Sequence, residues 1–131
     1  MKGSYILLIH LYEDKNIQVG RLGKLFFKKG YYAYVGSAMN GIEQRVQRHL
    51  RHNKKTHWHI DYLLRHAEIK NVFYKENQHR EECKIAEKLN KKLKNIQRFG
   101  CTDCKCNSHL FYGSLESIVD LIMKLGYVEY F

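Results

Sequence analysis

The sequence predicts an α+β fold in which helices flank a small, largely antiparallel central sheet. Two observations carry this prediction: short strand-forming segments occur near both ends of the chain, and segments with helical periodicity lie between them. Strands and helices do not alternate regularly, which argues against a Rossmann-type parallel sheet. The 131 residues, 44% hydrophobic and 27% charged, fit one globular domain with its own core.

The first third of the chain is expected to supply most of the sheet. Residues 5–12 are apolar and rich in strand formers, and residues 13–16 form a turn cluster. Short strands are expected at 17–19 and 25–27, and a longer one over 31–37. The chain has no proline, so these turns must rely on Gly, Asn and Asp.

Two helices are expected next. Asn40 is the predicted N-cap of the first, with Glu43 as its reciprocal partner three residues later. The apolar stripe of this helix recurs at four-residue spacing, at Ile42, Val46 and Leu50. A loop at 53–56 then leads into a second helix, which is expected over 57–66 and offers Trp58 as a core candidate.

The second half of the chain is expected to mix strands and helices. A strand over 69–74 precedes a third helix over about 80–93, and a polar, cysteine-rich loop covers 101–108. The remaining expected elements are a strand over 109–112, a helix capped by Ser114 and ended by Gly126, and a terminal strand over 127–131.

Charge and cysteine usage narrow the classes of function. Lys and Arg number 23 against 13 Asp and Glu, and a net charge of +10 implies an anionic partner such as nucleic acid or an acidic membrane surface. No segment has the length of a membrane span, and the apolar run from Ile6 to Leu11 is too short for an export signal. We therefore expect a cytoplasmic protein whose cysteines are thiols or metal ligands.

The first predicted helix and the loop after it are strongly basic. Glu43 is the only acidic residue between Asn40 and Ile60. The basic residues in this stretch are Arg45, Arg48, His49, Arg51, His52, Lys54, Lys55, His57 and His59. A helix face that is merely solvated usually mixes charge signs, so this stretch is predicted to contact a phosphate backbone. A solvated charged face is the alternative.

The third predicted helix carries a carboxylate on its apolar side. Glu82 shares helical spacing with Ile85, Ala86 and Leu89, whereas Glu81 falls on the polar side. Burial of an unpaired carboxylate is costly, so Glu82 should have a cation, hydrogen-bond donors or a metal as its partner. A helix-edge glutamate paired with Lys or Arg is the alternative.

The cysteines near the C-terminal end offer a second candidate for metal binding. Cys101, Cys104, Cys106 and His109 are soft ligands at short spacing, which is typical of a structural zinc site. The spacing is irregular, however, and four such ligands need not converge. Zinc binding and buried, inert thiols are both left open by the sequence.

Four motifs occur in an order that resembles the signature of the GIY-YIG nucleases. They are Gly3-Ser4-Tyr5, Tyr34-Val35-Gly36, the Arg45–His49 pair on a helix, and Glu82. The stretch Tyr-Val-Gly-Ser-Ala before a helix with Arg-x-x-x-His is similar to that of phage homing endonucleases. The first motif departs from the family pattern, since Ser4 stands where the family has isoleucine.

The resemblance extends from Gly3 to about Leu93. The cysteine-rich segment and residues 108–112 resemble those of compact, standalone prokaryotic GIY-YIG-like proteins. The expected organisation is therefore one domain over 1–131, in which 94–131 forms a C-terminal extension packed on the rest.

The resemblance implies a metal-dependent endonuclease that hydrolyses DNA phosphodiester bonds without a covalent intermediate. The implied catalytic residues are Tyr5, Tyr34, Arg45, His49 and Glu82. Glu82 would hold one Mg²⁺ or Mn²⁺, and Arg45 would stabilise charge on the phosphoryl oxygens. Tyr5 or Tyr34 would activate water, which requires positive charge nearby to lower a phenol pKa from about 10. His49 would contact phosphate or assist proton transfer.

Further residues are expected to bind substrate. They are Gly36, Arg48, Arg51, Lys54, Lys55 and His59. Tyr5 and Tyr34 are expected on neighbouring strands that face one cleft. The expected partner is nucleic acid, most simply DNA in repair or processing, with a DNA-repair protein as a further partner. A DNA- or RNA-binding module without turnover is the alternative, and a purely structural zinc protein would leave the basic helix unexplained.

Overall fold

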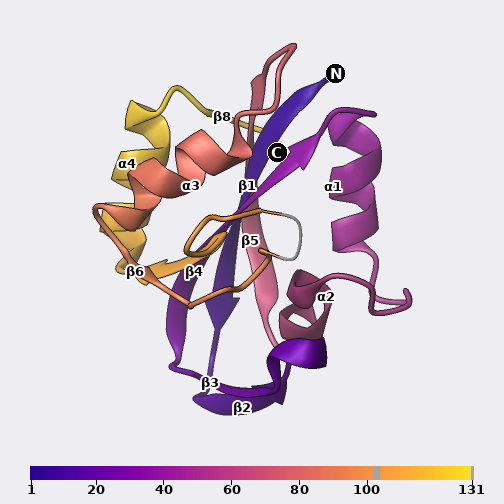
Figure 1. Cartoon of the computed structure of the whole chain (residues 1–131), viewed down its shortest axis with the longest axis vertical. Helices are drawn as coiled ribbons and strands as arrows, with labels where there is room; N and C mark the ends of the chain where they lie inside the picture. The colour runs from indigo at the N-terminus through magenta and orange to yellow at the C-terminus, as the bar shows by residue number, and fades with distance from the viewer. Residues whose placement is uncertain (102–103, 131) are drawn as a thin grey trace.

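The computed structural model describes residues 1–101 and 104–130, and it confirms the α+β class (Figure 1). Three nine-residue strands, β1 (Gly3–Leu11), β4 (Gly30–Ala38) and β5 (Glu68–Glu76), form the centre of an antiparallel sheet. The strand order is β6-β7-β4-β1-β5-β8. The shorter outer strands are β6 (Lys94–Asn95), β7 (Leu110–Gly113) and β8 (Val128–Glu129).

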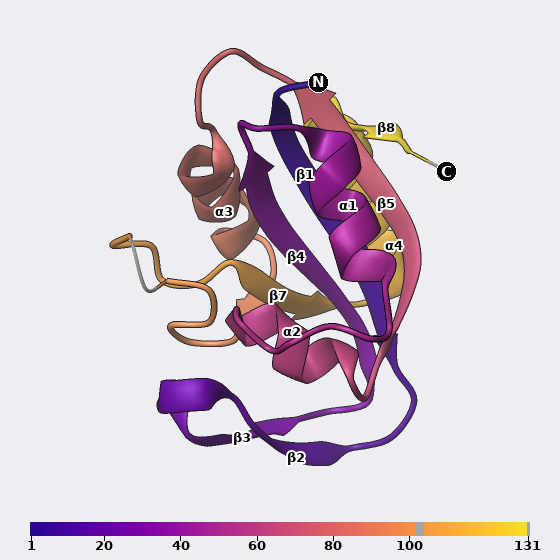
Figure 2. The same cartoon turned by 90° about the vertical axis from the view of Figure 1, so that its right-hand side faces the viewer.

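A separate two-stranded hairpin and four helices complete the fold. The hairpin pairs β2 (Lys15–Gln18) with β3 (Lys24–Phe27), and a 3-10 turn at Gly20–Leu22 connects them. The helices are α1 (Ile42–Leu50), α2 (His59–Leu64), α3 (Glu82–Asn90) and α4 (Leu115–Lys124). In Figure 2, α1 lies across the near face of the sheet, while α2 and the hairpin lie below it.

Side chains of the central strand alternate between two cores, as the two-residue period of a strand requires. Tyr5, Leu7 and Ile9 enter the core that includes residues of α1, α2 and the hairpin. Ile6 and Leu8 enter the opposite core, beside α3 and α4. The buried β1 strand is therefore apolar on both faces, which is why its sequence reads as a continuous apolar run.

The first helix begins differently from the prediction. It starts at Ile42 with Gly41 as its N-cap, and no side chain caps it, so the predicted Asn40–Glu43 capping box is wrong. Gly41 has a φ of 137°, a conformation that favours glycine, and it reorients the chain between β4 and α1. Glu43 instead accepts a hydrogen bond from the amino group of Met1 at 3.0 Å.

The second helix is shorter than the predicted range of 57–66. The Asp61 carboxylate accepts hydrogen bonds from the backbone N–H groups of His57 and Trp58, at 2.8 and 2.9 Å. This arrangement fixes the chain in an extended conformation before His59, where the helix begins. The acidic side chain three residues after the N-cap marks the true start of the helix.

The C-terminal third of the chain is integrated into the sheet at both edges. β7 pairs with β4, and β8 pairs with β5, so residues beyond 94 extend the sheet on each side. The predicted terminal strand reached Phe131, which lies outside the described residues. Among the described residues, no helix combines the length and apolar character needed to cross a membrane.

Candidate active site

A pocket of about 580 Å³ opens beside the N-terminal end of β1 and the C-terminal end of β4. Its lining comes from both strands, from α1 and α2, from the start of α3 and from the loop before β7. The lining includes six residues that were predicted to be catalytic or to bind substrate: Tyr5, Tyr34, Gly36, Arg45, His59 and Glu82. Segments far apart in the sequence therefore converge on one cavity.

Tyr5 and Tyr34 lie on neighbouring strands and line this one pocket, in agreement with the predicted placement. Tyr5 pairs with Gly36 across the two strands, and its ring lies over that glycine. A Cβ atom at Gly36 would come within 2.4 Å of the Tyr5 Cζ and Oη atoms. Gly36, predicted to bind substrate, therefore has a direct structural task, since its missing side chain makes room for the phenol.

His49 lies beneath Tyr5 and is buried. The Tyr5 hydroxyl and His49 Nε2 share a hydrogen bond of 2.7 Å, while His49 Nδ1 has no hydrogen-bond partner among the described residues. Burial lowers the pKa of His49 to about 3, although the charge of Asp61 opposes the shift. The imidazole is therefore neutral at pH 7, and its Nε2 contacts the Tyr5 phenol.

Burial raises the pKa of both tyrosines well above the ordinary value for a phenol. For Tyr5 the charge of Arg45 opposes this effect but does not reverse it. The lowered phenol pKa that a resting base would need is therefore absent from these two residues. Tyr34 is 8% exposed and edges on the pocket, so its phenol is more accessible than that of Tyr5.

Arg45 reaches the pocket from α1 and is held in place on two sides. Its Nη1 donates to the Ser37 carbonyl at 3.2 Å, and its guanidinium lies 4.5 Å from the centre of the Trp58 ring. A cation over an aromatic ring is oriented without being neutralised. Arg45 therefore presents a fixed positive charge to any anion that enters the pocket.

Arg48 has a different environment, although it lies less than one helical turn from Arg45. Its two terminal nitrogens donate to the two carboxylate oxygens of Asp61, each at 3.0 Å. Its guanidinium also stacks over Trp58 and donates to the Lys55 carbonyl. Burial would raise the pKa of Asp61, but the hydrogen bonds from Arg48, Trp58 and His57 outweigh it and the pKa is lowered. Arg48 is thus engaged in a structural ion pair.

Glu82 is the first residue of α3, and its side chain is 21% exposed at the rim of the pocket. Its side chain is partly buried and lines the pocket, about one helical turn before the buried Ile85 and Ala86 on the inward side of α3. The predicted cationic partner is present, since Arg80 Nη1 lies 3.3 Å from Oε1. His109 Nδ1 lies 3.9 Å from the other oxygen, Oε2.

The remaining basic residues divide between two surfaces. His59 lines the pocket, where its Nδ1 accepts a hydrogen bond from the Gly100 N–H at 2.8 Å. Arg51 and Lys54 line a second cavity of about 630 Å³ on the other side of His49. Lys54 Nζ donates to the His49 carbonyl at 3.2 Å, so it is tied to the end of α1, whereas Lys55 is exposed.

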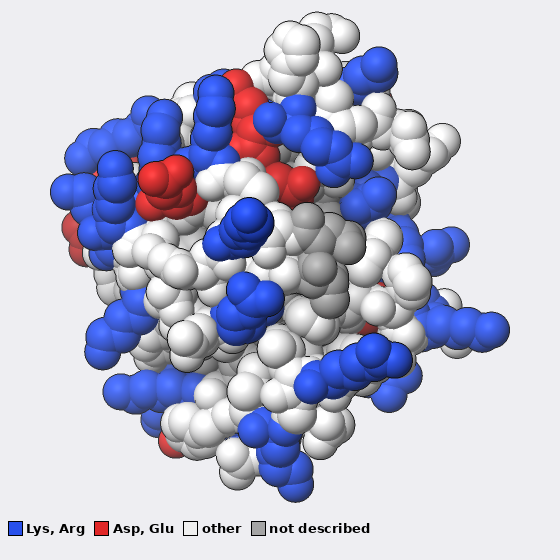
Figure 3. Space-filling view, viewed as in Figure 1, with Lys and Arg blue, Asp and Glu red and all other residues white. Residues whose placement is uncertain are grey.

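Lysine and arginine side chains are scattered over the visible face of the molecule, and acidic residues are fewer there (Figure 3). The acidic groups that are visible gather mainly in the upper half of that view. The basic excess of the sequence is therefore spread over a broad surface, which suits a polyanion better than a small anion.

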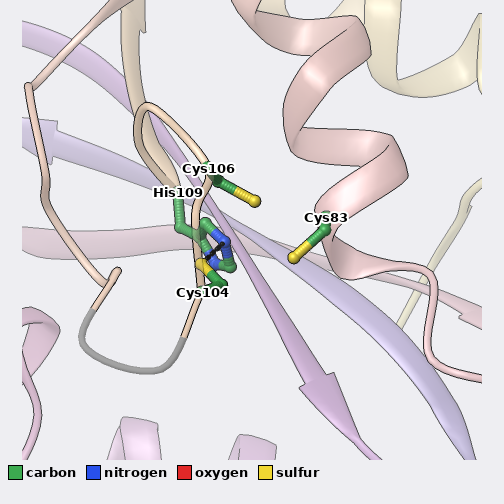
Figure 4. A group of neighbouring side chains, drawn as sticks. All are labelled: Cys83, Cys104, Cys106 and His109. Carbon is green, nitrogen blue, oxygen red and sulfur yellow. Dashed lines mark hydrogen bonds between the residues drawn. The ribbon is translucent and has the colours of Figure 1, made fainter.

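A second cluster of chemically active side chains lies next to the pocket. The ligand atoms of Cys83, Cys104, Cys106 and His109 all lie within 4.8 Å of one another and could hold a metal ion (Figure 4). Cys83 comes from α3, and the other three come from the loop that leads into β7. His109 Nε2 lies 3.4 Å from the Cys104 sulfur.

Cys101 does not belong to this cluster, so the predicted ligand set is wrong at one position. Its thiol is buried and donates to the Phe99 carbonyl at 3.5 Å. Burial, together with the neighbouring Cys104, raises the pKa of Cys101 to about 12. Cys83, which the zinc motif of the sequence did not include, is the fourth member of the cluster and lies on a helix 21 residues before Cys104.

Residues 4–127 match the model of a family described as domain of unknown function DUF123. This match covers nearly the whole chain. The chain belongs to the DUF123 family. Comparison with curated proteins and comparison with solved structures gave no match.

Several residues of this DUF123 site escaped the sequence analysis. Trp58 packs against the core as expected, but its ring also lies beneath the guanidinium groups of Arg45 and Arg48, which the sequence did not indicate. Arg80 was treated as the start of a helix, yet it lines the pocket beside Glu82. One signal was available for Cys83: it is the only cysteine outside the 101–106 segment, and it follows the candidate Glu82 directly.

Proposed function

We propose that this DUF123 protein is a metal-dependent endonuclease that hydrolyses phosphodiester bonds of DNA, as its resemblance to the GIY-YIG nucleases implies. The observation that carries the proposal is the convergence of Tyr5, Tyr34, Arg45 and Glu82 on one pocket. Two phenols, a guanidinium and a carboxylate on separate elements match the chemistry that hydrolysis of a phosphodiester requires. A DNA repair or processing role, with a repair protein as partner, fits such an activity.

A nucleic-acid substrate is supported by charge. The net charge is +10, and exposed cations such as Arg51 and Lys55 lie on the same side of the fold as α1. Phosphate contacts supply most of the sequence-independent affinity for DNA. Arg48 is not one of the cations proposed to contact phosphate, because its terminal nitrogens donate to Asp61.

The proposed hard metal ion fits the carboxylate rather than the thiols. Glu82 is the acidic residue among the described residues that line the pocket, and its two oxygens lie near Arg80 and His109, which line the same pocket. Mg²⁺ and Mn²⁺ prefer carboxylate and water ligands, whereas thiolates are soft. A bound ion would polarise the phosphate and stabilise the leaving oxygen.

The other residues of the pocket would then each have a separate role in the reaction. Arg45 would stabilise negative charge on the non-bridging oxygens of the scissile phosphate. One of the two phenols would orient and deprotonate the attacking water, and the Tyr5 hydroxyl shares a hydrogen bond of 2.7 Å with His49 Nε2. Water attack at phosphorus breaks the bond to the leaving oxygen, and no covalent intermediate forms with the protein.

A second candidate function is a DNA- or RNA-binding module that has lost turnover. The observation that favours it is the electrostatic state of the phenols, since burial raises the pKa of both Tyr5 and Tyr34. Such a module would bind nucleic acid in a salt-dependent manner without cleaving it.

A cleavage assay distinguishes these functions. The purified protein is incubated with Mg²⁺ or Mn²⁺ and with duplex, single-stranded, flapped and branched DNA, and with RNA of matched sequence. The nuclease proposal expects cleavage of DNA that EDTA stops and that Arg45→Ala lowers by about a hundredfold or more. Tight binding with no cleavage of any substrate would support the binding module instead.

A further inference from the structure

The side chains of Cys83, Cys104, Cys106 and His109 form a ligand set that the pocket chemistry does not use. Their four ligand atoms lie within 4.8 Å of one another. In a tetrahedral zinc site, sulfur and nitrogen ligand atoms are roughly 3.5–3.8 Å apart, as bond lengths of about 2.3 and 2.0 Å dictate. The Cys104–His109 distance of 3.4 Å is close to that spacing.

The chemistry of the set selects one class of metal. Three thiols and one imidazole are soft and borderline ligands, which favour zinc over Mg²⁺ or Mn²⁺. Figure 4 shows Cys83 pointing from α3 toward the loop side chains, which leaves a site enclosed by protein on two sides.

We propose that these four residues bind one structural zinc ion, which joins α3 to the loop before β7, and that His109 transmits this constraint to Glu82. The two ring nitrogens of His109 face different partners. Nε2 faces the Cys104 sulfur at 3.4 Å, and Nδ1 faces the Glu82 Oε2 at 3.9 Å. A zinc-bound imidazole carries its proton on the other nitrogen, where it can donate to a carboxylate.

The position of His109 is fixed by the sheet. Its carbonyl accepts a hydrogen bond from the Val35 N–H at 3.0 Å, and its N–H donates to the Phe99 carbonyl at 2.8 Å. Cys83 directly follows Glu82, so zinc bound at Cys83 also fixes the first turn of α3. Glu82 is therefore held from two directions, through its own helix and through the His109 ring.

Zinc content tests the binding site without any assay of activity. The full chain, expressed in zinc-supplemented medium and dialysed, is expected to contain one zinc per molecule. Cys83→Ser should lower that content severalfold, whereas Cys101→Ser, the matched control, should leave it unchanged. A wild-type protein without zinc, or equal zinc content in Cys83→Ser and wild type, would overturn the site.

Thiol labelling tests the same site in the unaltered protein, in case Cys83→Ser does not fold. Mass spectrometry would record which cysteines an alkylating reagent modifies before and after zinc is removed by a chelator. Chelation is expected to increase labelling at Cys83, Cys104 and Cys106 together. Unchanged labelling of Cys83, with zinc-dependent protection of Cys101, would contradict the proposed ligand set.

His109→Cys tests the link to Glu82, a step that rests on the proposed nuclease function. Four thiolates still bind zinc, but the imidazole that faces Glu82 is gone. Zinc content is expected to remain at one per chain, while affinity for Mn²⁺, measured by titration, falls about tenfold. Unchanged Mn²⁺ affinity would overturn the link. If even the wild-type protein did not bind Mn²⁺, both the link and the hydrolase proposal would be overturned. The zinc content would still decide whether the zinc site exists.

Discussion

Helix α1 carries two arginines three residues apart, one at a closed site and one at the open pocket, and their surroundings are opposite in kind. On the closed side, Arg48 is bound by the buried carboxylate of Asp61, which is 0% exposed. On the open side, Arg45 faces the pocket and is oriented by Trp58 and the Ser37 carbonyl. The fold therefore uses one arginine for its own stability and leaves the other free to meet an anion, although the sequence presents them as one basic run.

The largest expected effect on stability comes from the closed side. Arg48→Ala leaves the Asp61 carboxylate buried with only two backbone donors, and we expect a loss of about 3–5 kcal/mol of unfolding free energy. Arg45→Ala, the matched variant on the open side, should change stability far less. Urea denaturation measures both. If Arg48→Ala were as stable as wild type and bound DNA more weakly, Arg48 would belong to the open side instead.

Gly36, at the floor of the pocket, should also tolerate substitution poorly. A methyl group at Gly36 would meet Tyr5 Cζ and Oη at 2.4 Å, so Gly36→Ala must displace the phenol and break its bond to His49. We expect a loss of about 3 kcal/mol from overpacking. Ser37→Ala is a suitable control, because Ser37 Oγ is buried without a hydrogen-bond partner among the described residues. Thermal unfolding of the two variants should differ clearly, and equal melting temperatures would contradict this account of the floor.

The unfolding free energy should depend on pH through the buried side chain of His49. Its pKa is about 3 in the folded state and about 6.5 when unfolded, so the unfolded chain takes up a proton first as the pH falls. The stability due to neutral His49 is therefore complete above pH 6.5 and declines toward pH 3, by about 2 kcal/mol between pH 7 and pH 5. Denaturation at several pH values should show a shallower decline for His49→Gln. An identical slope would mean that His49 does not govern this window.

The smallest effect on stability is expected for two exposed cations after helix α1. Arg51 and Lys55 are exposed, so replacing both with alanine should leave the unfolding free energy within about 0.5 kcal/mol of wild type. If both contact phosphates, the slope of log K against log salt should fall by about 2 in a DNA-binding titration. An unchanged slope would locate the nucleic-acid surface elsewhere on the molecule.

Local patterns were enough to predict the parts of the site that lie within one element. The apolar runs of β1 and β4 predicted their strand character, and helical spacing placed Arg45 and His49 on one face of α1. Spacing could not predict which cation would be neutralised, because the partner of Arg48 lies 13 residues away, in α2. The start of α1 was missed because Gly41, with its positive φ, replaces the expected Asn40 cap.

The rim of the pocket was harder to predict than its floor. Helical periodicity placed Glu82 on the inward side of α3, but its position beside the pocket depends on where α3 docks on the sheet. The exchange of Cys101 for Cys83 has the same origin, since it depends on how the loop before β7 lies against α3. Both features are set by long-range packing rather than by local sequence.

The central claim is that the open side of α1 belongs to a metal-dependent hydrolytic site, and Glu82→Gln tests it most directly. With Mg²⁺ present, we expect this variant to bind DNA like wild type and to cleave it at least about a thousandfold more slowly. Glu81→Gln, the adjacent carboxylate on the same helix end, should cleave normally. Cleavage by Glu82→Gln at the wild-type rate would contradict the claim.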